Sequence, residues 1–324
     1  MLKTHLSCMQ KALDAQKRSK HPQYKVAALI RSTIKDNHYS ESIQTNDWPQ
    51  HFINTIGTSC KLGNSSTTIH AEVNALLNAK EFFCQNASIY ITDLPCPNCA
   101  KMIVASGIHS VYIDFGAYNS LLGQKIRPFY DTVSALILQS AGCNIFTIDM
   151  DQESITRLFQ PSTEETNHRD EQETLTHIPD QTENLDITFV DHIKSLDHSS
   201  SEGIAACLAK DPYDNMIFLS TTSSPSEGLD NEHIAVIQNT QKKYEPVIRP
   251  LNALLSKCAK HGLSIVPNYI YSRHTPTSRE FVNIIGADCS RLFLLQPDIC
   301  RDPHGQEAKR MLEQYGIIEL IDLK

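Results

Sequence analysis

Two short stretches constrain this chain of 324 residues more than any other feature. The first is His70-Ala71-Glu72, and the second is Pro95-Cys96-Pro97-Asn98-Cys99. Together they supply one imidazole, two thiolates and a carboxylate that need not bind metal. Three nitrogen and sulfur ligands that leave a fourth position open to water are the pattern of a catalytic zinc site. The sequence therefore predicts that His70, Cys96 and Cys99 bind zinc.

The carboxylate of Glu72 has a place in the chemistry of such a site. Zinc lowers the pKa of a bound water from about 15.7 to about 7. The resulting hydroxide can attack an electron-poor ring carbon that carries an amino group. A carboxylate beside the metal can then carry the proton to a ring nitrogen and to the departing ammonia. Glu72 lies two residues after His70 and is predicted to be this catalytic group.

The spacing of Cys96 and Cys99 allows both sulfurs to face one metal from the first turn of a helix, whose N-terminus stabilises thiolates. A Cys-x-x-Cys pair by itself is also typical of redox motifs and of half of a structural zinc site. No second Cys-x-x-Cys occurs among the ten cysteines, which argues against a four-cysteine site.

Length and composition indicate a soluble globular protein with room for two domains. Hydrophobic residues make up 40% of the chain and charged residues 20%, which are ordinary globular values. No apolar run approaches the length of a membrane helix, and the segment Met1-Leu2-Lys3-Thr4-His5 lacks an apolar signal core. Because a metal-binding thiolate pair is expected among the cysteines, we expect a cytoplasmic, reducing location.

The net charge of −8 is unevenly distributed along the chain. Residues 1–150 carry 13 Lys and Arg against 10 Asp and Glu, whereas the remainder carries 16 against 27. This asymmetry indicates two units with different surfaces. It does not favour a strongly basic nucleic-acid platform.

Hydrophobic patterning in residues 1–150 predicts strands that alternate with helices, and hence an α/β layered sheet. Helices are expected over residues 3–19, 69–83, 97–107 and 128–141, and strands over 25–31, 39–44, 88–92, 110–115 and 144–148. A polar loop is expected over residues 46–67. Both groups of ligands then fall at helix N-termini beside strand ends, where such sheets bind ligands. Residues 151–184 are acidic and poor in apolar residues, which predicts a flexible linker.

Residues 1–150 resemble the cytidine and deoxycytidylate deaminase superfamily, and deoxycytidylate deaminases most closely. The resemblance rests on His-x-Glu followed by Pro-Cys-x-x-Cys, a signature of zinc base deaminases, and on residues 69–75, 95–103, 107–108 and 111–112. It implies a three-layer α/β/α fold around a five-stranded mixed sheet. It also implies zinc binding by His70, Cys96 and Cys99, with Glu72 as the proton shuttle.

The resemblance extends to candidate substrate contacts. Asn46 and Pro49 match the Asn-x-x-Pro element of the family, whose Asn contacts the nucleotide, although Asp47 replaces the usual Gly and no Gly-Tyr precedes it. The backbone N–H of Ala71 is implied to contact the base. Trp48 is a candidate for stacking on a base, and a role in packing is an equal alternative.

Residues 185–324 repeat the pattern of the first unit. Residues 204–208 parallel 26–30, residues 251–255 parallel 73–77, and residues 276–286 parallel 97–107. In this register His70 falls against Ile248, Glu72 against Pro250, Cys96 against Thr275, Cys99 against Ser278 and Asn46 against Ser224. The replacements form no zinc site, which predicts a degenerate deaminase-like domain and one zinc ion per chain. Chance similarity between two α/β halves is the alternative.

Three arginines surround the lost site in this register, namely Arg249, Arg273 and Arg279. A basic pocket at helix N-termini is suited to phosphate, so a phosphate site in the second domain is one hypothesis. The alternative is that this half only completes a pseudo-dimer interface, with each arginine paired to carboxylates of its own unit.

The sequence predicts a zinc-dependent hydrolytic deaminase that converts a cytosine nucleotide, such as dCMP, to the uracil product and ammonia. One alternative is deamination within a nucleic acid, of adenosine in transfer RNA or of cytosine in DNA or RNA. Asn74 and the lack of a basic patch favour the free nucleotide. The other alternative is a non-catalytic regulatory protein that contains zinc, against which the intact Glu72 argues.

The expected partners follow from this prediction. The substrate is a small-molecule nucleotide, and no membrane is involved. The two units form a pseudo-dimer within the chain, and a homodimer of the whole chain remains open.

Overall fold

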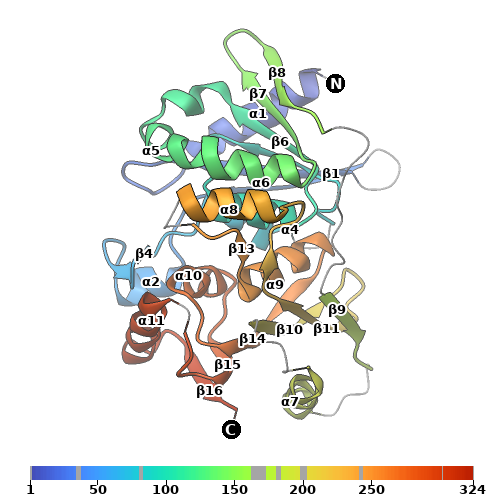
Figure 1. Cartoon of the computed structure of the whole chain (residues 1–324), viewed down its shortest axis with the longest axis vertical. Helices are drawn as coiled ribbons and strands as arrows, with labels where there is room; N and C mark the ends of the chain where they lie inside the picture. The colour runs from blue at the N-terminus through green and yellow to red at the C-terminus, as the bar shows by residue number, and fades with distance from the viewer. Residues whose placement is uncertain are drawn as a thin grey trace.

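The computed structural model describes residues 2–33, 38–79, 83–161, 173–179, 184–197, 203–240, 244–300 and 302–323. Within these ranges the chain forms two stacked units, each built on a mixed sheet of six strands. Figure 1 shows the N-terminus at the far end of one unit and the C-terminus at the far end of the other.

The first unit has its strands and helices in alternating order. Its elements are α1 (Leu2–Gln16), β1 (Ala27–Thr33), β2 (Tyr39–Thr45), α2 (Gln50–Thr55), β3 (Lys61–Leu62), β4 (Ser65–Ser66), α3 (Ala71–Leu77), β5 (Ser88–Ile91), α4 (Pro97–Ala105), β6 (Ser110–Asp114), the 3₁₀ turn η2 (Phe115–Asn119), α5 (Leu121–Phe129), the π turn η3 (Tyr130–Ser134), α6 (Ala135–Ser140), β7 (Asn144–Asp149) and β8 (Ser154–Phe159).

The second unit follows the same plan. Its elements are β9 (Glu173–His177), α7 (Leu185–Ser195), β10 (Ile204–Lys210), β11 (Met216–Thr222), β12 (Ser224–Pro225), α8 (Asn231–Thr240), β13 (Val247–Ile248), α9 (Pro250–Lys260), β14 (Ser264–His274), α10 (Ser278–Gly286), β15 (Arg291–Gln296), α11 (Pro303–Gln314) and β16 (Glu319–Asp322).

Each sheet lies between two layers of helices. Strand β1 shows why: Ala28 and Ile30 pack into the core that contains α3 and α4, whereas Leu29 packs against α1 on the opposite face. Because successive side chains of a strand point to opposite faces, a strand buried on both sides is an unbroken apolar run. In the second unit α7 covers one face of the sheet and α9 the other.

Five strands of the two sheets share one order and one set of directions. The first sheet runs β2-β1-β5-β6-β7, and the second runs β11-β10-β14-β15-β16. In both, the first two pairings are antiparallel and the next two are parallel. The α/β class and the mixed sheet are confirmed, and the shared topology is consistent with a tandem repeat.

Each sheet also has a sixth strand beyond the five that the resemblance implies. Strand β8 pairs with β7 at one edge of the first sheet, and β9 pairs with β11 at an edge of the second. Both added strands lie in residues 151–184, where the sequence predicted a flexible linker. A strand at the edge of a sheet can pair its backbone N–H and C=O groups without burying a large apolar face. Low hydrophobicity therefore did not exclude strands in this segment. Residues 162–172 and 180–183 of that segment lie outside the described residues.

The two units pack through the helices that carry the ligand motifs and their counterparts. Helices α3 and α4 of the first unit contact α9, and α3 also contacts α10. In addition, each unit sends a segment over the other: the β3-β4 hairpin lies against α10 and α11, and α8 lies against η3 (Figure 1). The core that joins the two units is a single cluster.

Three expected elements differ from the structure. The loop 46–67 contains α2 and the β3-β4 hairpin, and the helix expected over 69–83 ends at Leu77, where the amide of Asn78 donates to the carbonyl of Asn74. The helix expected over 128–141 begins earlier, at Leu121, and its path includes Pro128. Proline removes a helical hydrogen bond, which accounts for the π turn that follows it.

None of the helices in the described ranges is both long and apolar enough to cross a membrane.

Candidate metal centre

The ligand residues stand at the N-termini of two neighbouring helices. His70 is the N-cap residue of α3, and Cys96 is the N-cap residue of α4, with Pro97 at the first helical position. Proline is favoured there because its missing N–H is not needed. Cys99 follows one turn later on α4. The sequence motifs are therefore brought together by two helix starts that lie on the same face of one sheet.

The three donor atoms fit a tetrahedral metal. The Nδ1 atom of His70 lies 3.3 Å from Cys99 Sγ and 3.5 Å from Cys96 Sγ, and the two sulfurs lie 3.6 Å apart. Zinc–sulfur and zinc–nitrogen bonds of about 2.3 and 2.0 Å in a tetrahedron separate ligand atoms by about 3.5 to 3.8 Å. Within the described residues, this is the group of three His, Cys, Asp or Glu side chains that could hold a metal ion.

The pKa values of the two thiols are shifted in opposite directions. Hydrogen bonding with Cys99, together with the nearby His70, holds the pKa of Cys96 well below its usual range, although burial opposes this. Hydrogen bonding to Cys96 and burial raise the pKa of Cys99. The lowered pKa favours the thiolate of Cys96, which is the form that a metal binds.

Glu72 lies in the first turn of α3 and is only 4% exposed. Its carboxyl lies close enough to Cys99 for each group to affect the pKa of the other, which places it beside the donor cluster. Burial raises the pKa of Glu72 to about 7, against the lowering effect of His70. A buried carboxyl that is held next to a metal site and exchanges its proton near neutral pH is suited to proton transfer.

Asp93, which was not singled out from the sequence, is a buried carboxyl three residues before Cys96. Its Oδ1 accepts from the N–H of Leu94 at 2.8 Å, and its Oδ2 accepts from the hydroxyl of Ser120 at 2.6 Å. Burial raises its pKa to about 6, although both hydrogen bonds oppose this.

The three candidate substrate contacts lie around the helix start that carries His70. The side-chain oxygen of Asn46 accepts from the backbone N–H of Val26 and the hydroxyl of Ser19, and its amide donates to the carbonyl of Tyr24. These bonds leave at most one N–H of Asn46 for a ligand. The N–H of Ala71 belongs to the first turn of α3, where N–H groups lack helical partners.

Trp48 stacks on His21, with ring centroids 5.3 Å apart. Its buried Nε1 has no hydrogen-bond partner among the described residues. Burial, followed by the charge of His70, lowers the pKa of His21, so the stacked pair lies within electrostatic reach of the ligand. Contacts of Asn46, Ala71 and Trp48 with substrate remain predictions.

The counterpart of this site in the second unit is closed by a carboxylate. The bridge between Asp47 and Ile69 corresponds to the pairing of Ser224 with Ile248, so the helix start at His70 corresponds to that at Arg249. The N-cap of α10 is Thr277, which places Thr277 opposite Cys96 and Glu280 opposite Cys99.

The register inferred from the sequence is therefore wrong by one or two residues. Arg249 replaces Ile248 as the counterpart of His70, and Leu251 replaces Pro250 as that of Glu72. The offset drifts because the segments that join the matched elements differ in length between the two units. Asn46 likewise corresponds to Ser223. The N–H of Asn46 donates to the carbonyl of Val26, and the N–H of Ser223 donates to the carbonyl of Gly203 at the same place in the second sheet. The corrected set is still no zinc site, because it contains neither imidazole nor thiolate.

The three arginines of the predicted phosphate site make contacts in different places. Arg249 forms an ion pair with Glu245, and Arg273 hydrogen-bonds Gln296. Arg279 reaches across to the first unit, where it donates to the carbonyl of Thr68. A shared phosphate site for the three remains a prediction.

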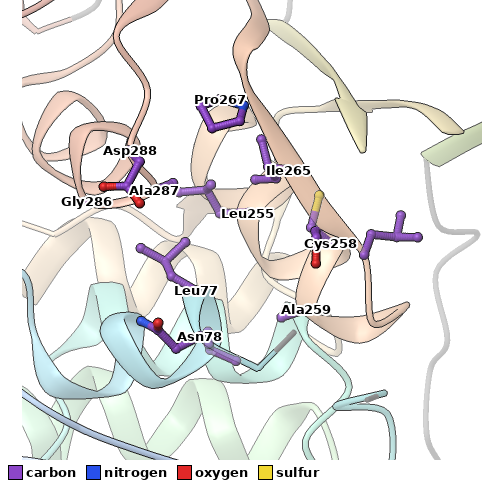
Figure 2. A pocket seen from close by; sticks show the side chains of 13 residues that line it. Leu77, Asn78, Leu255, Cys258, Ala259, Ile265, Pro267, Gly286, Ala287 and Asp288 are labelled. Atoms are coloured by element: carbon purple, nitrogen blue, oxygen red, sulfur yellow. The ribbon is translucent and has the colours of Figure 1, made fainter. Parts of the chain in front are cut away.

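A small pocket lies elsewhere between the two units, as Figure 2 shows. Its labelled lining includes Leu77 and Asn78 from the end of α3, Leu255 and Cys258 from α9, and Pro267 from β14. The cavity measures about 70 Å³. Pockets for drug-sized ligands are several times larger, and none of the metal donor atoms lines this one.

The α/β sheet and the His70, Cys96 and Cys99 cluster lie in the first unit, and it is this unit that matches known proteins. Residues 2–114 match the family model described as the cytidine and deoxycytidylate deaminase zinc-binding region. An uncharacterized deaminase in the luxG 3′ region of Aliivibrio fischeri is 34% identical over 118 residues, which cover 36% of this chain and 77% of that protein. The chain therefore belongs to the cytidine and deoxycytidylate deaminase family.

Two further relatives carry a more specific name. The deoxycytidylate deaminase of Enterobacteria phage T4 is 38% identical over 88 residues, which cover 26% of this chain and 40% of the phage protein. The solved dCMP deaminase of cyanophage S-TIM5, in apo form, is 23% identical with a TM-score of 0.29, covering 38% of this chain and 92% of that one. The chain thus spans about two fifths of the phage T4 enzyme.

Proposed function

We propose that this protein catalyses hydrolytic deamination of a cytosine nucleotide, with dCMP as the reference substrate. The observation that carries the proposal is the juxtaposition of the three metal donors with the buried carboxyl of Glu72, in the first turn of the helix that begins at His70. A structural zinc site needs no such carboxyl. The name of the phage T4 relative, deoxycytidylate deaminase, supports the choice of dCMP.

The reaction adds water to the ring carbon that bears the amino group and releases that group as ammonia. A zinc ion held by His70, Cys96 and Cys99 would supply an electrophile that acidifies water to a pKa near 7. Glu72 accepts one proton of the attacking water and delivers it to the ring nitrogen. It then takes the remaining hydroxyl proton of the tetrahedral adduct and gives it to the leaving amine as the C–N bond breaks. The uracil product keeps the oxygen of the water.

Substrate positioning is assigned to the groups around the start of α3. The N–H of Ala71 donates to the base, and the remaining N–H of Asn46 contacts the nucleotide. The indole N–H of Trp48, buried and without a described partner, is a further donor toward the bound ligand. Both cysteines must stay reduced, so a reducing compartment belongs to this proposal.

The test is a panel of substrates with the full chain. Purified protein is incubated with dCMP, dCTP, deoxycytidine and a single-stranded DNA that contains cytosine, and ammonia release and base change are measured. Turnover of the free nucleotide supports the proposal. Turnover of the DNA alone would assign the nucleic-acid alternative, and turnover of none, with zinc bound, would assign the non-catalytic alternative.

The proposal includes one zinc ion per chain. Elemental analysis of the purified protein is expected to give one equivalent of zinc, held at the cluster that contains His70. Two equivalents would contradict the conclusion that the second unit has no metal site.

A further inference from the structure

The second unit places a cation at the edge of the first unit's metal centre. Arg279, at the start of α10, donates from Nη1 to the carbonyl of Thr68 at 2.8 Å and from Nη2 to the hydroxyl of Ser66 at 3.4 Å. Thr68 lies two residues before His70. The N-terminus of α10 is fixed against this segment, because Ser278 also hydrogen-bonds Ser65 and Asn64.

The charge of Arg279 acts on the metal-binding cysteines. Burial lowers the pKa of Arg279, whereas the charges of Cys96 and Cys99 oppose this effect. Tyr244, also from the second unit, lies close enough for the same two cysteines to affect its own ionisation. An arginine remains charged in either case, so a fixed positive charge borders the site.

Lys101 of the first unit fixes the segment that follows Tyr244. Its Nζ donates to the carbonyl of Glu245 at 3.0 Å and to that of Val247 at 2.9 Å. Burial lowers the pKa of Lys101 to about 8. The ring of Tyr244 meets Phe129 of α5 edge to face, at 5.2 Å. The two units therefore interlock beside the metal centre through Lys101 and Tyr244 as well as through the start of α10.

Arg279 has donors left for a ligand. A guanidinium carries five N–H groups in a planar fork that matches a phosphate. The contacts described for Arg279 use two of them. A half-buried cation that borders a site for a nucleotide base, with donors to spare, is suited to the anionic part of the same nucleotide.

We propose that Arg279 of the second unit binds the phosphate of the nucleotide whose base occupies the His70, Cys96 and Cys99 site. The inference rests on the proposed function and extends it to specificity for the phosphorylated substrate. It also gives the metal-free unit a role, since that unit completes the site of the other. The contact would be made within one chain.

The test compares Arg279→Gln, Arg279→Lys and the control Arg291→Gln with the wild-type chain. Arg291 is a second-unit arginine on β15 that pairs with Asp186. For each protein, kcat and KM are measured with dCMP and with deoxycytidine, together with zinc content and thermal unfolding. Arg279→Gln is expected to raise KM for dCMP by about 10- to 100-fold, as expected for loss of a charge-assisted hydrogen bond, and to leave kcat/KM for deoxycytidine within about 2-fold.

Arg279→Lys is expected to recover part of the loss with dCMP, and Arg291→Gln to match the wild type. Equal losses for dCMP and deoxycytidine would overturn the inference, because they indicate a structural role, and so would no loss with dCMP. A wild-type chain that turns over neither substrate refutes the proposed function alone. Calorimetric binding of dCMP then decides the inference: weaker binding by Arg279→Gln supports it, and unchanged or absent binding overturns it.

Discussion

At the scale of single residues, Glu72 is the group on which the proposed chemistry depends. Glu72→Gln keeps the size and burial of the side chain but removes its ability to shuttle a proton. We expect deamination of dCMP to fall by about 10²- to 10⁴-fold, the usual contribution of a general acid–base group. Zinc content is expected to stay at the wild-type level, because His70, Cys96 and Cys99 are intact. A variant with near-normal turnover would show that another group carries the proton.

The metal donors make a separate prediction that needs no substrate. Cys96→Ser and Cys99→Ser each replace a thiolate by a much poorer zinc ligand, so each variant is expected to lose most of its zinc on dialysis. Cys289→Ser is the matched control, because Cys289 is equally buried but hydrogen-bonds the carbonyl of Arg291 in the second unit. Elemental analysis measures all three. Retention of zinc by both site variants would refute the assignment of the donors.

Single residues were also where the sequence was most and least informative. The motif residues were identifiable because one metal demands particular atoms at fixed spacings, and the structure brings their side chains together. Asp93 and Lys101 were not, because their roles depend on partners 27 and more than 140 positions away. Arg279 was singled out for a site within the second unit, whereas its described hydrogen bonds lie in the first.

At the scale of elements, the second unit uses a carboxylate where the first has its metal donors. Glu280 Oε2 accepts from the N–H and the hydroxyl of Thr277, which completes a capping box at the start of α10. Its Oε1 accepts from the N–H of Leu251 in α9. One buried side chain therefore joins the two helix starts of the second unit, whereas in the first unit a metal ion held by His70, Cys96 and Cys99 would join them.

Glu280→Ala should separate these two helix starts. It leaves the buried N–H of Leu251 and the partly buried N–H of Thr277 without their partner. An unsatisfied buried group costs about 1–3 kcal/mol. We expect the free energy of unfolding to fall by about 2–4 kcal/mol, measured by urea denaturation, with zinc content unchanged. Glu313→Ala, at an exposed position of α11, serves as the control. A loss of zinc in Glu280→Ala would contradict the expectation that zinc binding in the first unit is independent of Glu280.

The sequence predicted helices and strands well where the apolar pattern was strong. It failed where packing against other parts of the chain determines the bounds of an element. The β1, β5 and β6 strands and α4 lie close to their expected ranges, because each buries a regular apolar face. Strands β8 and β9 were missed because edge strands need little hydrophobicity. The shortened α3 and the register of the second unit could not be derived from one sequence, since helix ends and loop lengths there depend on packing between units.

At the scale of the whole molecule, the two units exchange segments in a nearly reciprocal way. The hairpin of the first unit places Gly63 against the carbonyl of His304 in α11, and the loop before α8 places Gly228 against the carbonyl of Ser140 at the end of α6. A Cβ atom at Gly63 would lie 2.5 Å from the carbonyl oxygen of His304, and a Cβ atom at Gly228 would lie 1.8 Å from that of Ser140. The backbones of the two units therefore approach as closely as glycine allows.

This close approach predicts how strongly the units depend on one another. Gly228 has a φ of +76°, and Gly57 has a φ of +77° but no neighbour among the described residues within 4 Å of where a Cβ would lie. Gly57→Ala thus reports only the strain of the left-handed backbone, about 1 kcal/mol. Gly228→Ala adds the clash with Ser140 and should cost a further 1–3 kcal/mol, roughly as overpacking does. Urea denaturation measures both variants. Equal losses of unfolding free energy would mean that α8 and its loop contribute little to holding the units together. A larger loss for Gly228→Ala, accompanied by reduced turnover of dCMP, would show that docking of the second unit supports the site of the first.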